Sequence, residues 1–116
     1  MDHYVIWFNL RDTSRDVAFT KSLAEFLGRL ADHGAIEGYA LTRRKLGFGP
    51  PELGEFMLDV RVRDLAQLEA AFGGVAPRVG AMEKAHAAVW SQVVDFRSGL
   101  FRDFPDAVRG KMAEDP

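Results

Sequence analysis

The sequence lacks cysteine altogether. This absence excludes a disulfide scaffold, cysteine-ligated zinc, an iron–sulfur cluster and a thiol nucleophile. Long apolar runs are absent as well: the longest, Tyr4 to Phe8, is far shorter than the roughly 20 residues of a membrane-spanning helix. The amino terminus has no basic start of a signal peptide, and the single asparagine, Asn9, is not in a glycosylation motif. We therefore expect a cytoplasmic protein.

The charge has no strong excess of either sign. Fifteen Lys and Arg against 17 Asp and Glu give a net charge of −2, which disfavours binding to nucleic acid or to an anionic membrane. With 116 residues, 47% of them hydrophobic and 28% charged, the chain has the size and composition of one globular domain. We expect that domain to span residues 1–105, followed by a flexible tail over 106–116.

The hydrophobic pattern predicts alternating strands and helices. Apolar residues at three- and four-residue spacing predict a long amphipathic helix over 15–33, while clean alternation over 55–62 predicts a strand with one buried face. A second helix begins after Asp64, and Gly73-Gly74 break it before a continuation through Pro77, Val79, Met82, His86 and Val89. The remaining predicted strands cover residues 3–10, 36–46 and 89–97.

This order, β-α-β-β-α-β, is the pattern of a ferredoxin-like sandwich, an α+β fold in which helices cover one face of a four-stranded antiparallel sheet. Right-handed connections give the strand order 4-1-3-2, so the first and third strands are central. Tyr4 and Ile6 occupy one face of the first strand, but Val5 and Trp7 make the other face apolar too. Two helices cover only one face. We therefore predict that a second copy of the chain covers the other, in a homodimer.

With this layout the chain resembles the dimeric α+β-barrel proteins, and among them the small uncharacterised bacterial members. The resemblance covers residues 3 to about 104 and is carried by the element order, the long helix over 15–33, HYVIWFNL at the start and VVDFRSGLF near the end. It implies a ligand cavity between paired sheets. Members of that superfamily include cofactor-independent monooxygenases, stress-responsive proteins, haem-handling enzymes and ligand-binding regulatory domains.

Alternation along the strands indicates which side chains would face such a cavity. They are His3, Trp7 and Asn9 from the first strand and Asp59 and Arg61 from the third. A carboxylate beside an arginine can hold a polar ligand or act as a general base if burial raises its pKa. The alternative interpretation is an ion pair across the dimer or in solvent.

The resemblance also implies an enzymatic alternative, because cofactor-independent monooxygenases of this superfamily use an Asn, a Trp and a His around the substrate. Asn9, Trp7 or Trp90, and His3 or His86 match those types. Both tryptophans equally suit core or interface anchors, and His86 suits either a hydrogen-bonded core histidine or a haem ligand. Three separated histidines and no phosphate-binding glycine motif predict neither a metal nor a cofactor.

Three hypotheses follow from the sequence. The first is a homodimer of unresolved biochemical role that binds a small, largely apolar molecule between its sheets. The second is a cofactor-independent monooxygenase or related small-molecule enzyme. The third is a structural or interaction module without a ligand.

Overall fold

A computed structural model of the chain describes residues 1–75 and 80–105. The predicted α+β fold is confirmed: a four-stranded antiparallel sheet carries three helices. The strands are β1 (Asp2–Leu10), β2 (Gly38–Arg43), β3 (Phe56–Val62) and β4 (Val93–Arg102), and the helices are α1 (Asp16–Asp32), α2 (Leu65–Val75) and α3 (Gly80–Trp90).

The sheet has the predicted strand order, β2-β3-β1-β4. β1 is central and pairs with β3 in a register that places Val5 opposite Asp59 and Trp7 opposite Met57. On its other side β1 pairs with β4, with Trp7 opposite Arg97. Residues directly opposite each other point to the same face of a sheet, so these five side chains share one face.

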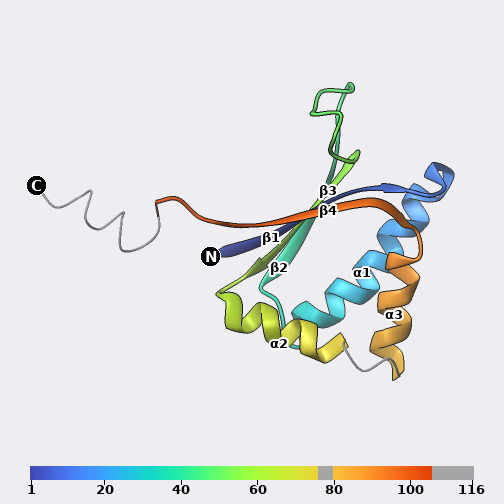
Figure 1. Cartoon of the computed structure of the whole chain (residues 1–116). Helices are drawn as coiled ribbons and strands as arrows, with labels where there is room; N and C mark the ends of the chain where they lie inside the picture. Colours follow the sequence, from blue (N-terminus) through green and yellow to red (C-terminus); the bar gives the residue numbers. More distant parts are fainter. Residues whose placement is uncertain (76–79, 106–116) are drawn as a thin grey trace, which may run out of the picture.

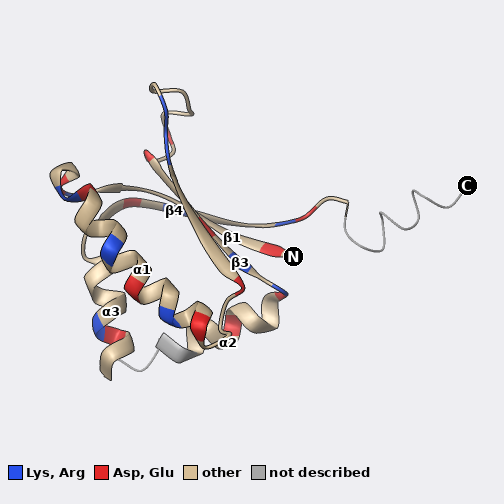
Figure 2. Cartoon of the chain, turned by 180° about the vertical axis from the view of Figure 1, so that it is seen from behind, with Lys and Arg blue, Asp and Glu red and all other residues tan. Residues whose placement is uncertain are grey.

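The core lies between the sheet and the helices, which all occupy one side of the sheet (Figure 1). Alternate residues of β1 and β3 point into it, among them Phe8 and Leu58, which are fully buried. The apolar stripe of α1 packs onto them because its residues recur every three or four positions. Charges of both signs lie along the outer surface of α1 (Figure 2). Within residues 1–75 and 80–105, no helix lies on the opposite face of the sheet (Figure 1).

Local signals at the element ends agree with the prediction. The Asp12 carboxylate accepts a hydrogen bond from the Ser14 amide at 3.0 Å and caps the short 3₁₀ helix η1 (Thr13–Arg15), which lies between β1 and α1. Gly34 follows α1 with φ +72°, a left-handed conformation that glycine adopts without strain. The Asp64 carboxylate accepts from the Gln67 amide at 2.9 Å and caps α2.

The prediction for the fourth strand is wrong in its bounds. Residues 89–92 do not belong to it: α3 continues to Trp90, and β4 begins at Val93 and extends to Arg102. Val89 is fully buried against the core, so packing of α3 outweighs the strand preference of a Val-Trp pair. β4 also carries a bulge opposite Trp7 and Asn9, where Asp95 has φ 57°.

The predicted division of the second helix is confirmed, because α2 and α3 are separate helices, but the predicted position of the break is wrong: Gly73 and Gly74 lie within α2, which continues to Val75. Pro77 and Val79, which were expected to begin the continuation, and the expected tail over 106–116 lie outside the described residues. The second strand is shorter than the predicted 36–46, since β2 covers Gly38–Arg43. Among the described residues, no helix combines the length and the apolar character needed to cross a bilayer.

Candidate functional site

The helix-free side of the sheet, which we call the open face, combines apolar and charged side chains. Its apolar part comprises Val5, Trp7 and Met57, together with Phe101 from β4, whose ring contacts Trp7 edge-to-face at 6.2 Å between centroids. Gly99 lies opposite Val5, and the Trp7 and Phe101 rings lean over it. The centre of the open face is therefore apolar, and no helix or strand among the described residues covers it.

Charged side chains lie beside this apolar centre. The His3 ring lies between two carboxylates: Nδ1 donates to Asp59 at 3.0 Å and Nε2 donates to Asp103 at 2.7 Å. The hydrogen bond to Asp103 and then that to Asp59 raise the pKa of His3 above its ordinary value of 6.5, and His3 lowers the pKa of Asp103. Within residues 1–75 and 80–105, the guanidinium groups of Arg61 and Arg97 have no hydrogen-bond or ion-pair partner.

Asn9 bridges the two neighbours of β1 at its end. Its Nδ2 donates to Asp95 Oδ2 at 3.1 Å, and its Oδ1 accepts from the Glu55 amide at 2.9 Å. Both ends of the amide are therefore used to hold the bulge of β4 and the start of β3. The contacts assign Asn9 a structural role.

Replacing Asn9 by Ala should therefore lower the free energy of unfolding by about 1–2 kcal/mol, since the partly buried Glu55 amide would lose its acceptor. Urea denaturation at fixed protein concentration measures this effect. Thr20→Ala, which removes a hydrogen bond from an exposed hydroxyl on α1, is the control and should change stability by less than about 0.5 kcal/mol. An Asn9→Ala variant as stable as the original chain would contradict the structural role.

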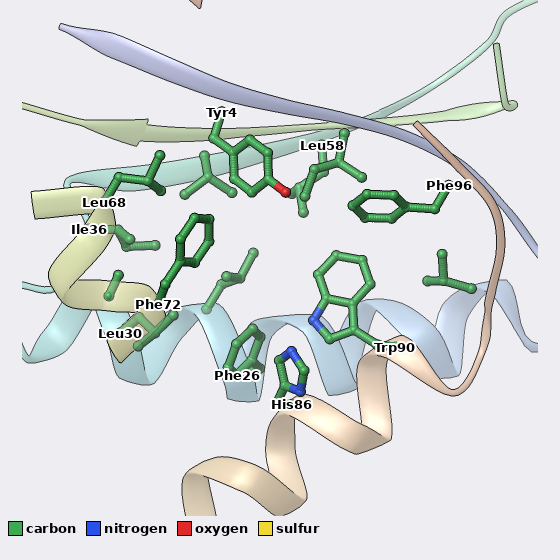
Figure 3. A pocket seen from close by; sticks show the side chains of 15 residues that line it. Tyr4, Phe26, Leu30, Ile36, Leu58, Leu68, Phe72, His86, Trp90 and Phe96 are labelled. Atoms are coloured by element: carbon green, nitrogen blue, oxygen red, sulfur yellow. The ribbon is translucent and has the colours of Figure 1, made fainter. Parts of the chain in front are cut away.

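A pocket of about 360 Å³ lies on the other side of the sheet, between β1, β3 and the three helices (Figure 3). We call it the chamber. Its wall is almost entirely apolar and rich in rings, which come from every layer of the fold. Six ring-bearing residues line it: Tyr4, Phe26, Phe72, His86, Trp90 and Phe96.

Three polar groups interrupt this apolar wall. The Tyr4 hydroxyl points into the chamber, and the rings of His86 and Trp90 border it from α3 (Figure 3). Among the described residues, neither the Tyr4 hydroxyl nor the Trp90 indole N–H has a hydrogen-bond partner. His86 lies edge-on to Phe26 at 5.3 Å, with Glu83 Oε2 3.9 Å from its Nδ1. The chamber thus offers hydrogen bonds to a guest that is otherwise apolar.

The structure divides the candidate residues between two places. His3, Trp7, Asn9, Asp59 and Arg61 lie on the open face as predicted, whereas His86 lines the chamber on the opposite side. His3 and Asn9 are six residues apart on one strand, about 20 Å. The Asn, Trp and His residues that match the monooxygenase pattern therefore do not form one site. Trp90 and His86 lie together at the chamber, whereas Asn9 lies on the open face, on the other side of the sheet.

Sequence reasoning missed the chamber. Its aromatic side chains were visible in the sequence, but their rings reach one space only because α2 and α3 separate and because the β4 bulge turns Phe96 toward the helices. The sequence signal that could have predicted it is the number of aromatic residues at positions that face the helices. That number is larger than the closely packed core of a small domain needs.

The basic run Arg43-Arg44-Lys45 makes part of its contacts inside the fold. Arg43 pairs with Asp16 at 3.0 Å and with Glu55 at 3.4 Å, and Arg44 donates to the carbonyl oxygens of Pro50 and Leu53 at 2.8 Å. Both arginines thereby hold the β2–β3 loop. Within the described part of the chain, no group of three or more His, Cys, Asp or Glu side chains is arranged to hold a metal ion.

Comparison with solved structures identifies the fold among known proteins. At3g17210 of Arabidopsis thaliana superposes with a TM-score of 0.66 at 6% identity, over 89% of this chain and 95% of its own. A dimeric ferredoxin-like protein of unknown function from Jannaschia sp. gives 0.64 at 11% identity, over 88% and 98%. Another so described, from Thermobifida fusca, gives 0.59 at 13% identity, over 88% and 90%. These likenesses confirm the ferredoxin-like fold.

Comparison by sequence is less informative. A family model described as a family of unknown function, DUF6614, matches residues 1–115. A search of curated proteins found no match. The family model and the two bacterial structures agree with the predicted resemblance to uncharacterised bacterial proteins of this fold. Both of these solved proteins are described as dimeric.

Proposed function

We propose that this chain, which belongs to the DUF6614 family, is a homodimer that binds a small, largely apolar molecule in the chamber of each protomer. The observation that carries the proposal is an aromatic-lined space of about 360 Å³ within a small domain. The ligand site is therefore assigned to the space between sheet and helices, instead of the space between paired sheets that the sequence favoured.

The dimer is supported first by the apolar character of the open face. Trp7, Met57 and Phe101 form a contiguous surface, and Met57 and Phe101 are 38% and 55% exposed in the monomer. Contiguous apolar surface of this kind marks interaction sites in soluble proteins. Solved relatives with the same fold are described as dimeric.

The charges of the open face favour a second copy over another partner. Each protomer presents the guanidinium groups of Arg61 and Arg97, which have no partner among the described residues, together with the carboxylates of Asp59 and Asp103. In a two-fold arrangement, every patch of one protomer meets the same surface of the other, so a face with both signs complements itself.

The chemistry of the ligand follows from the chamber wall. Aromatic and aliphatic side chains remove apolar surface from water at about 25 cal/mol per Å², which favours a ring-containing guest. The Tyr4 hydroxyl and the Trp90 N–H add two donors that have no partner in the described part of the chain, so a guest with one or two oxygen acceptors would satisfy them. An ionised guest is disfavoured, because no described lysine or arginine lines the chamber.

The chain offers a direct test because it has only two tryptophans, one in each place. Nitrogen-15 spectra resolve their indole N–H signals, and a Trp7→Phe variant assigns them. The uncharged apolar probe N-phenyl-1-naphthylamine should shift the Trp90 signal and leave the Trp7 signal unchanged. A probe that shifts only the Trp7 signal, or neither, would contradict a ligand site in the chamber.

Filling the chamber should weaken binding of the probe. Ala71 on α2 is buried and lines the chamber, so Ala71→Leu places three more carbon atoms inside it. We expect at least about a tenfold loss of affinity for the probe, equivalent to about 1.4 kcal/mol, measured by fluorescence titration.

Ala70 provides the matched control, because it precedes Ala71 on the same helix but is exposed and does not line the chamber. Ala70→Leu should bind the probe as the original chain does. Equal affinity in both variants would show that the probe binds elsewhere.

A further inference from the structure

We propose that His3 makes closure of the dimer depend on pH: two copies associate through the open face while His3 is protonated and separate more readily once it is neutral. The inference rests on the homodimer proposed above but not on the ligand. It follows from where His3 lies and from what surrounds it.

The geometry around His3 requires a proton on each ring nitrogen. Asp59 lies 3.0 Å from Nδ1 and Asp103 lies 2.7 Å from Nε2, and an ionised carboxylate can only accept. A neutral imidazole carries one N–H and can satisfy one of them. Loss of the proton therefore leaves the other carboxylate facing a nitrogen lone pair.

Other charged groups around His3 do not replace that proton. From β3, Arg61 lies opposite His3 in the register, and its guanidinium group has hydrogen-bond donors but no acceptor. From the chain start, the Met1 ammonium lies 3.8 Å from the Asp103 carboxylate. From β4, the residue opposite His3 is Phe101, which is apolar.

The position on the open face turns this local chemistry into control of association. The His3 and Asp59 side chains are only 21% and 28% exposed in the monomer, and they lie beside the apolar surface that a second copy would cover. Covering the cluster removes water, so an unpaired carboxylate there costs more in the dimer than in the monomer. The two-fold axis doubles the effect.

The sign follows from linkage. The carboxylates already hold the pKa of His3 above 6.5 in the monomer, although desolvation of the ring acts against them. When a second copy excludes water, the attraction between the two carboxylates and the imidazolium becomes stronger, and we infer that this gain exceeds the added desolvation and raises the pKa of His3 further in the dimer. A group with a raised pKa stabilises the associated state fully at low pH and loses that contribution as pH rises through the raised value. Dimerisation should therefore weaken above neutral pH.

Sedimentation velocity at a series of concentrations, from about pH 6 to about pH 9, measures the effect. We expect the dissociation constant of the dimer to rise about tenfold or more over this range. His3→Gln should flatten this dependence of the dissociation constant on pH. The variant keeps the Met1 ammonium, so any pH dependence that remains in it does not come from His3. His33→Gln, at the exposed end of α1, is the matched control and should keep the original slope.

Asp103→Asn provides a second variant, because Asp103 is 61% exposed and its loss should not unfold the chain. It should move the midpoint of the transition to lower pH, together with the His3 titration observed by NMR. A dimer with the same dissociation constant at every pH, or a His3→Gln variant that keeps the slope, would overturn the inference and leave the dimer intact. A chain that is monomeric at every pH would overturn both.

Discussion

Replacing Trp7 by Ala should weaken the dimer by about 2–4 kcal/mol, the usual effect of truncating a central aromatic anchor in an interface. Trp7 lies on the middle strand of the open face, contacts Phe101, and borders a hollow of about 190 Å³ beside the β2–β3 loop. Its removal leaves the centre of the proposed contact without its largest side chain. Light scattering after size-exclusion chromatography should show monomers at micromolar concentration.

The control for this variant is Phe72→Ala on α2. Phe72 is also an exposed aromatic residue, at 48%, but it belongs to the helix side of the sheet. Its truncation should leave association unchanged. A Trp7→Ala dimer as tight as that of the original chain would mean that the interface lies elsewhere.

Replacing Phe8 by Ala should lower the free energy of unfolding by about 3–5 kcal/mol, because truncation of a buried ring loses apolar burial and leaves a cavity. Phe8 is completely buried on β1, and its ring contacts those of Phe19 and Phe56 with centroids 5.4 and 5.5 Å away. A domain of this size has about 5–15 kcal/mol of stability in total, so the variant should be close to unfolding.

Urea denaturation at one protein concentration measures the effect, since the stability of a dimer depends on concentration. Phe48→Ala is the control: Phe48 is 82% exposed in the β2–β3 loop, and its loss should cost less than about 0.5 kcal/mol. A loss below about 1 kcal/mol for Phe8→Ala would show that these rings are not the centre of the core.

The arrangement of the sheet was predictable because its signals are local and periodic. Alternation in β1 and β3 separated Ile6 and Leu58, which are buried, from Trp7 and Met57, which lie on the open face. Element order and the handedness of crossovers then determined the strand order. The same alternation placed five candidate residues on one face correctly.

The chamber and the bounds of β4 were not predictable because they depend on packing between distant elements. Val89 and Trp90 favour a strand locally, but burial of Val89 beneath α1 keeps them in α3. Asp95 then introduces a bulge, which changes which residues of β4 face the helices. His86 and Phe96 lie near the rings of β1 and α1 because α3 extends to Trp90 and because β4 carries this bulge.

Sedimentation velocity of the unmodified chain, from low nanomolar to tens of micromolar near neutral pH, tests the central claim most directly, namely that a second copy covers the open face. The account predicts a species with twice the chain mass of 12.9 kDa at the upper concentrations, dissociating on dilution. A single species of 12.9 kDa at every concentration would contradict it.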